Sequence, residues 1–288
     1  MTIRVRPAML VALIVLLGGL AALVFWASRP IAGQSSTYRA QRLAGTDHPD
    51  LSGLWQALTS ANWDIEPHGV QESPFVRLLG VWAAQPAGEG IVESDEIPYK
   101  PEALARKKAN FERRLKVDPH QVHEMGDPEA KCYMPGVPRA TYMPYPFQII
   151  QSTSKIVVAY AFNSASRTIS LASHPEAPVD SWMGWSNGRW DGDTLVVDVT
   201  GLNGLSWLDR SGNFMSENAR VVERYTPASP NHLMYEATIE DSTVFTRPWK
   251  ISLPLYRRLE RNAQFFEFKC VDLAEEYLYG SLKDPRGN

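Results

Sequence analysis

The sequence predicts a mainly β protein: an antiparallel meander that forms a barrel or a curved sheet, preceded by an apolar N-terminal helix and one basic helix. From Phe147 onwards, short runs of β-branched and aromatic residues alternate with turn sequences. Asp191-Gly192 separates two such runs and is a strong hairpin signal. A barrel would remove exposed strand edges and enclose an interior.

The N-terminal segment indicates where the protein works. Residues 8–27 read AMLVALIVLLGGLAALVFWA and carry no charge. As a helix they would span about 30 Å, the thickness of a bilayer's hydrocarbon core. Two interpretations of residues 1–27 stay open, a cleaved signal peptide and an uncleaved transmembrane anchor, and the length of the run favours the anchor. Either one predicts a periplasmic, extracytoplasmic protein, held at the membrane through residues 8–27 or secreted.

The next part of the chain lacks strand periodicity. Residues 28–46 are small and polar and are expected to form a linker. Residues 47–130 are expected to wrap the main body irregularly, with a helix at about 101–116. Pro101 suits the first turn of that helix, where a missing N–H costs nothing. Its many Lys and Arg residues are expected to form a solvated face.

Residues 131–280 are expected to form the β-rich domain. The predicted strands are 147–151, 155–162, 167–171, 194–199, 221–226, 232–240, 250–255 and 263–270, with a turn at 227–231 and a short closing helix at 272–278. Only two cysteines occur, Cys132 and Cys270. In an oxidising compartment such a pair predicts a disulfide, and two buried thiols are the alternative.

Five blocks resemble a widespread family of exported bacterial proteins: PDLSGLW (49–55), CYMPGVP (132–138), GRWDGDTLVVD (188–198), VERYT (222–226) and FTRPW (245–249). The resemblance implies export and a β fold, and it implies no particular activity. Relatives often carry His and Glu directly after the late Cys, whereas Val271 and Asp272 stand here. A role of that His therefore does not transfer to this chain.

The block Gly53-Leu54-Trp55 also looks like the start of a lipocalin-type barrel. That resemblance implies that Trp55 packs under the barrel floor against an Arg from a late strand. Arg224 and Arg247 are the candidates for this cation–π contact.

The sequence favours neither a metal nor a cofactor. His120 and His123 could share a helix face, but Pro119 precedes them and no third ligand is evident, so a solvated loop is expected. Asp191-Gly192-Asp193 lacks the further oxygen ligands of a calcium loop. The formal net charge is −3, so no overall basic field indicates nucleic-acid binding.

Candidate site residues form an acidic, basic and aromatic constellation. Glu223 and Arg224 alternate along one strand, so one of them faces inward if the sheet closes. An inward carboxylate beside apolar rings would have a raised pKa and could act as an acid or base. The alternative is an Arg–carboxylate pair that fixes the barrel. The constellation comprises Arg167, Trp182, Trp185, Asp209, Arg210, Glu217, Glu223, Glu240, Arg247 and Trp249.

Three functions remain open on this basis. The first is binding of a hydrophobic small molecule by Arg167, Trp182, Trp185, Arg247 and Trp249. The second is a metal-independent enzyme with Glu223 or Glu240 as its acid–base group in the same cavity. The third is an envelope structural or assembly factor that acts through its surface.

Overall fold

The computed structural model describes residues 38–72, 84–114, 126–173 and 175–271, together with residues 278 and 281. The chain divides into two units, residues 1–39 and residues 40–288, and the second contains every element named below. The expected membrane segment at 8–27, the pair His120 and His123 and most of the expected helix at 272–278 lie outside the described residues. Within the described ranges, no helix has the length and apolar character needed to cross a bilayer.

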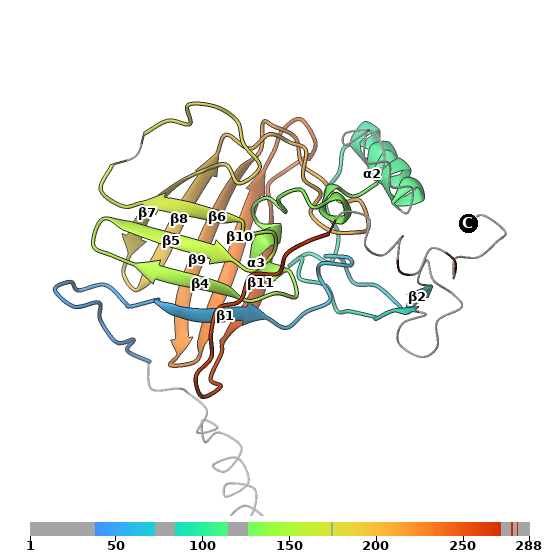
Figure 1. The fold of residues 1–288 in the computed structure, drawn as a ribbon. Helices are drawn as coiled ribbons and strands as arrows, with labels where there is room; N and C mark the ends of the chain where they lie inside the picture. Colours follow the sequence, from blue (N-terminus) through green and yellow to red (C-terminus); the bar gives the residue numbers. More distant parts are fainter. Residues whose placement is uncertain are drawn as a thin grey trace, which may run out of the picture. The chain divides into compact units, whose positions relative to one another are not determined.

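Nine strands form a closed barrel, which confirms the predicted β architecture (Figure 1). Around the barrel the order is β1-β11-β10-β9-β8-β7-β6-β5-β4, and β4 returns to β1. Neighbours pair antiparallel except β6 and β7, which run parallel over two residue pairs. The strands are β1 (Gly53–Ala57), β4 (Phe147–Gln151), β5 (Lys155–Tyr160), β6 (Ser166–Ser170), β7 (Trp185–Asp191), β8 (Thr194–Thr200), β9 (Arg220–Ser229), β10 (His232–Glu240) and β11 (Trp249–Arg257).

Period-two patterning explains why these segments close around one core. On β10, Leu233, Tyr235, Ala237 and Ile239 are buried, and the residues between them are at least partly exposed. Successive side chains of a strand point to opposite faces, so a one-residue slip would turn this apolar set outward. The hydrophobic pattern therefore fixes the register.

Two parts of the barrel differ from the sequence prediction. Residues 53–57, placed in the irregular segment, form β1 and close the barrel between β4 and β11. Residues 263–270, predicted as a strand, make only an isolated bridge between Phe268 and Phe162. The physical reason is closure, because a closed barrel leaves no free edge for another strand. β9 also continues to Ser229, two residues beyond the expected start of the turn at Pro227.

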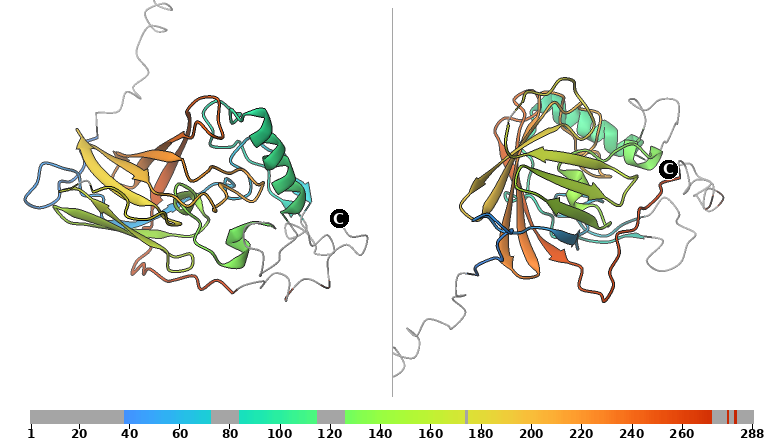
Figure 2. Two further views of the ribbon diagram at one scale, coloured as in Figure 1. Left: turned by 90° about the horizontal axis from the view of Figure 1, so that it is seen from above. Right: turned by 60° about the vertical axis from the view of Figure 1, so that its left-hand side comes forward.

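The helix α2 (Pro101–Arg113) lies at one end of the barrel (Figure 2). It buries Ala103 and Asn110, and the Asn110 Nδ2 donates to the Gly212 carbonyl at 3.1 Å. Arg106 lies over the Phe214 ring at 4.2 Å, while Lys108 is exposed as expected for a solvated face. The remaining short elements are β2 (Gln71–Glu72), β3 (Ala84–Gln85), η2 (Pro128–Lys131) and α3 (Arg139–Tyr142).

The predicted disulfide between Cys132 and Cys270 is confirmed, with 5.5 Å between the two Cα atoms. It joins the end of η2 to the segment that follows the last strand. The Phe268 N–H donates to the Ala161 carbonyl at 2.6 Å, and the Asn163 N–H donates to the Phe268 carbonyl at 2.9 Å. These contacts hold residues 268–270 against the barrel.

Candidate functional site

Trp55 contacts the guanidinium of a late-strand arginine, as expected, but of a different arginine from those named, and we call this contact the barrel floor. The Arg257 guanidinium lies over the Trp55 ring at 4.3 Å, and its Nη1 donates to the Ser52 carbonyl at 2.8 Å. The two candidates named from the sequence were wrong, because Arg224 forms an ion pair with Asp191 and Arg247 is exposed. Arg257 belongs to β11, which is paired directly with β1, so register decides which Arg reaches the Trp.

Inside the barrel, Arg167 and Glu223 form a bidentate ion pair with N–O distances of 2.5 and 2.9 Å. The hydroxyls of Tyr225 and Tyr235 donate to the same carboxylate at 3.0 and 2.8 Å. The Arg167 Nε donates to the Tyr160 hydroxyl at 3.0 Å. Side chains from four strands, β5, β6, β9 and β10, thus meet in one polar network within an apolar core.

This network leaves little capacity for acid–base chemistry at Glu223. Its carboxylate accepts four hydrogen bonds and has no exposed surface. Burial raises the pKa of Tyr225 and of Tyr235, with Glu223 adding to both shifts, so both hydroxyls stay protonated donors. Burial opposes the charge on Arg167, but the Glu223 carboxylate holds its pKa well above the usual value. The arrangement matches the structural alternative, an Arg–carboxylate pair that fixes the barrel.

The barrel interior is filled by side chains. A cavity that held a ligand would leave its lining accessible to a water-sized sphere even when closed to the outside. The inward side chains of the barrel are instead at most 5% accessible. They include Trp55, Phe147, Ile156, Val158, Tyr160, Arg167, Val197, Val199, Val221, Glu223, Tyr225, Tyr235, Ala237, Ile239, Ile251 and Leu253.

The five predicted ligand-binding residues have separate surroundings. Arg167 lies inside the barrel, and Trp249 is buried with its ring edge-on to Phe245 at 5.4 Å. Trp182 stacks on Tyr133 at 5.1 Å. Trp185 is 37% exposed at the start of β7 on the outer barrel face, and Arg247 is exposed in a loop. Glu240, the second acid–base candidate, pairs with Arg220 at 3.0 Å.

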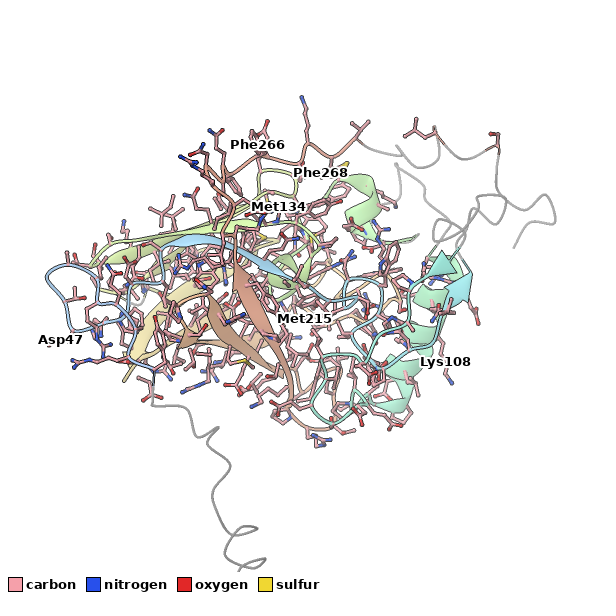
Figure 3. All side chains as sticks on the ribbon, turned by 90° about the horizontal axis from the view of Figure 1, so that it is seen from below. Asp47, Lys108, Met134, Met215, Phe266 and Phe268 are labelled. Atoms are coloured by element: carbon pink, nitrogen blue, oxygen red, sulfur yellow. A yellow bond between two sulfur atoms is a disulfide. The ribbon has the colours of Figure 1, made fainter. Side chains whose placement is uncertain are left out.

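An exposed apolar surface surrounds the disulfide, and we call it the aromatic surface. Its exposed residues are Phe266 (71%), Phe268 (43%) and Met134 (38%), which lie on the same side of the molecule (Figure 3). Beneath them, Tyr145 stacks on Phe268 at 4.4 Å and contacts Phe162 at 5.6 Å. The disulfide holds both segments of this surface together, because Met134 follows Cys132 by two residues and Phe268 precedes Cys270 by two.

Cationic side chains border the aromatic surface. Arg261 and Lys269 are exposed and flank Phe266 and Phe268 along the chain. Within the described residues neither makes an ion pair, whereas Arg258 is paired with Glu260 at 2.5 Å. Glu267 lies between the two rings in the chain, is exposed, and accepts a hydrogen bond from the Ser164 hydroxyl at 3.1 Å. The segment therefore combines exposed rings with two cations and one hydrogen-bonded carboxylate.

A second buried polar cluster lies outside the barrel wall, around Asp209. Its carboxylate accepts hydrogen bonds from the Ile65 N–H at 3.0 Å and from the Asn213 Nδ2 at 2.6 Å. Burial, with a contribution from the charge of Asp64, raises the pKa of Asp209 to about 7. Asp209 is fully buried, so the cluster is not open to a substrate.

Sequence reasoning missed the buried ion network beside this cluster. Arg139 pairs with Asp127 at 2.7 Å, and Arg210 pairs with Glu129 at 2.8 Å. The Arg139–Asp127 pair closes the segment that contains the CYMPGVP block, and the Arg210–Glu129 pair attaches that segment to the loop that contains Asp209. Charged residues spaced more than ten positions apart give no periodic signal, so only the fold reveals them.

No protein-family model, curated protein or solved structure matches the chain. Within the part of the chain that the structure describes, no group of three or more His, Cys, Asp or Glu side chains is placed to hold a metal ion.

Proposed function

We propose that this chain is an extracytoplasmic β-barrel protein, anchored or exported through its N-terminal segment, that binds a hydrophobic small molecule. The single observation that carries the proposal is the aromatic surface, where Phe266 exposes 71% and Phe268 43% of its area to water. Large apolar side chains exposed on one side of a protein are a typical feature of an interaction site. Because side chains fill the interior, we propose that the site lies on the outside of the barrel.

The charges beside the aromatic surface narrow the class of ligand. Arg261 and Lys269 belong to the same chain segment as the exposed rings and lack ion-pair partners among the described residues. An apolar molecule with one acidic group would satisfy both features, because its chain covers the rings and its carboxylate or phosphate meets a cation. We therefore expect an anionic amphiphile.

The first test is extraction of the chain from residue 34, exported and purified without detergent. The organic extract is analysed by mass spectrometry for a lipophilic compound in stoichiometric amount. The stripped protein is then titrated with a soluble fluorescent fatty acid below its micelle concentration, and saturable binding to a single class of site is expected.

Matched variants distinguish binding at the aromatic surface from non-specific hydrophobic binding elsewhere on the protein. Phe266→Ser and Phe268→Ser should each weaken binding of the fatty acid by about tenfold, because each removes an exposed ring from the contact. Leu58→Ser removes a side chain that is 69% exposed elsewhere and should leave binding unchanged. Equal binding by all three variants would overturn the proposal, as would binding of the protein to vesicles alone.

A further inference from the structure

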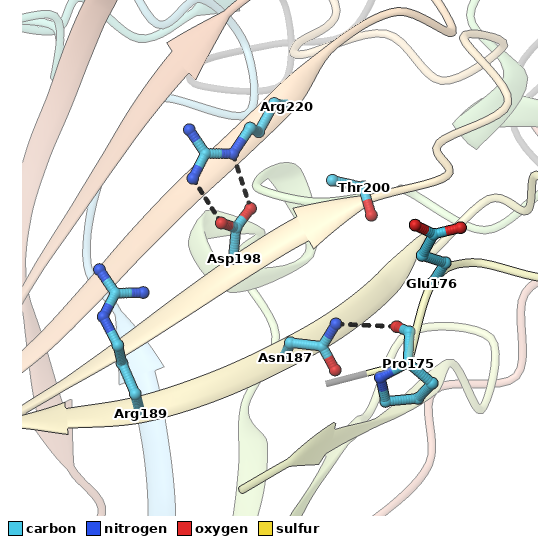
Figure 4. Close-up of a pocket in the computed structure, with 7 residues that line it drawn as sticks. All are labelled: Pro175, Glu176, Asn187, Arg189, Asp198, Thr200 and Arg220. Atoms are coloured by element: carbon cyan, nitrogen blue, oxygen red, sulfur yellow. Dashed lines mark hydrogen bonds and ion pairs between the residues drawn. The ribbon is translucent and has the colours of Figure 1, made fainter. Parts of the chain in front are cut away.

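The parallel step from β6 to β7 produces a hollow on the outer face of the barrel. Parallel neighbours need a crossover connection, and residues 175–184 run back along the outside of β7 and β8. The Asn187 Nδ2 donates to the Pro175 carbonyl at 3.0 Å. Gly201 has a φ of +62°, and a Cβ there would meet the Ala177 Cβ at 2.5 Å, so glycine permits the close approach. Between crossover and strands lies a hollow of about 260 Å³ (Figure 4).

The floor of this hollow is polar and preorganised. Arg220 on β9 donates to Asp198 on β8 through Nε at 2.9 Å and through Nη2, forming a planar pair. Asn187 lies directly opposite Asp198 in the β7–β8 register, and Thr200 lies beside them. Arg189 extends from the same face of β7 as Asn187, is exposed, and makes no ion pair with any described residue. The Asp198–Arg220 pair, the Thr200 side chain and one cation without an ion-pair partner among the described residues therefore line the hollow.

The Asn187 amide fixes the wall of the hollow. Its Nδ2 donates to the Pro175 carbonyl at 3.0 Å, and its Oδ1 is buried and has no hydrogen-bond partner among the described residues. Because this oxygen has almost no accessible surface, the amide shapes the hollow and does not itself contact a molecule inside it.

Trp185 adds an aromatic wall next to the hollow. It lies on the outer face of β7 two residues before Asn187, and its register partner is Thr200. Its side chain is 37% exposed, which is high for a tryptophan in a strand. The negative face of an indole attracts the slightly positive C–H groups of an aliphatic ring.

We infer that this hollow binds a single sugar ring bearing a carboxylate, a uronic-acid-type saccharide unit. Vicinal hydroxyls both donate and accept, which suits the fixed array of Asp198, Arg220 and Thr200. Arg189 supplies the charge-assisted contact to the carboxylate. Glu176 at the rim can accept from a hydroxyl. The volume lies below the range of about 300–1,000 Å³ typical of drug-sized ligands and so limits the buried part to about one ring.

The site differs in position and chemistry from the aromatic surface, so either proposal can fail alone. The test uses the full-length chain and two ligands that differ only at C6, methyl glucuronide and methyl glucoside. Calorimetric or NMR titration should show the glucuronide bound about tenfold more tightly than the glucoside. Arg189→Met should abolish this preference, and Trp185→Ala should weaken both ligands.

Arg247→Met is the matched control, because it removes an exposed cation from a loop elsewhere and should leave both titrations unchanged. All three substitutions are at exposed or half-exposed positions, and circular dichroism confirms that the fold is retained. Absence of saturation by the glucuronide at about 10 mM, roughly a thousandfold above a Kd of about 10 μM, would overturn the inference. An unchanged preference in Arg189→Met would also overturn it.

Discussion

Arg167 on β6 and Glu223 on β9 meet inside the barrel at N–O distances of 2.5 and 2.9 Å, with β7 and β8 lying between their strands in the barrel wall. Neither side chain reaches solvent to more than 2%. Two opposite charges taken out of water offset the cost of desolvation only when geometry is good and the remaining lone pairs are satisfied. The hydroxyls of Tyr225 and Tyr235 donate to the Glu223 carboxylate, and the Tyr160 hydroxyl accepts from Arg167. The ion pair and the three tyrosines therefore act as one unit.

Breaking this unit on one side should strongly destabilise the barrel. Arg167→Met leaves the Glu223 carboxylate buried without its counter-charge, and we expect a loss of about 3–5 kcal/mol in the free energy of unfolding. Urea denaturation followed by tryptophan fluorescence measures it. The double variant Arg167→Met/Glu223→Leu should lose less than the sum of the two single variants, because the uncompensated charge is gone.

Arg224→Met is the control for this experiment. Its ion pair with Asp191 is at the surface, with a side-chain exposure of 38%, and its loss should change stability by no more than about 1 kcal/mol. A small effect of Arg167→Met, equal to that of the control, would show that the pair does not hold the barrel together. That result would favour the alternative in which Glu223 acts as an acid–base group.

The barrel floor gives a second prediction, centred on Gly53. Its φ is +151°, and an added Cβ would lie 2.1 Å from the Arg257 Nη1. Gly53→Ala should therefore push the guanidinium off the Trp55 ring and lower stability by about 1–3 kcal/mol, from the lost cation–π contact and the strained backbone. Gly69→Ala is the control, since nothing lies within 4 Å of its added Cβ. Equal melting temperatures for the two variants would contradict this reading of the floor.

The fold was largely predictable from local patterns. Strands β4 to β6 and β8 to β11 have alternating or β-branched runs separated by turn sequences, and each appears within a few residues of its predicted position. β7 was indicated only by the hairpin signal Asp191-Gly192 at its end. β1 was missed because five residues that include Gly53 show little alternation. The supposed strand at 263–270 has suitable aromatic residues, but its pairing depends on a free edge, which no local pattern reveals.

The site was less predictable, because its groups come together only through closure and register. Arg167 and Glu223 were both singled out, yet their pairing depends on strands 56 residues apart in sequence. Trp185 was named without its neighbours, since the hollow exists only because β6 and β7 run parallel. Phe266 and Phe268 were read as strand residues rather than as an exposed surface, since alternation alone does not show which face water reaches.

The buried Asp209 predicts a pH dependence of stability. Its pKa is raised to about 7 in the folded state, against about 3.9 in an unfolded chain. Between these values the folded state holds a proton that the unfolded state has lost, so the unfolding free energy falls as pH rises from 4 to 7. The contribution of this one group is at most about 4 kcal/mol across that window.

Asp209→Asn isolates this contribution. The variant loses part of the hydrogen bonding to Ile65 and Asn213 and should be less stable at every pH. The difference in unfolding free energy between wild type and variant should be largest near pH 4 and shrink towards pH 7. A difference that stays constant or widens over this range would mean that Asp209 is ionised in the folded protein.

The disulfide yields the last prediction, which concerns one segment rather than the whole barrel. Cys132 and Cys270 are 138 positions apart, so closing this loop should stabilise the fold by about 5 kcal/mol at most in the chain-entropy account. Among the described residues, no strand pairs with residues 263–267, and the segment is fixed by the contacts of Phe268, by the Ser164–Glu267 hydrogen bond and by the disulfide. Reduction should therefore free this segment while the barrel stays folded.

Trypsin should then cut after Arg261 and Lys269 at least tenfold faster in Cys132→Ser/Cys270→Ser than in the oxidised protein, while sites in the barrel strands stay protected. Cleavage at equal rates in both proteins would show that the backbone bonds of Phe268 alone keep the aromatic surface in place.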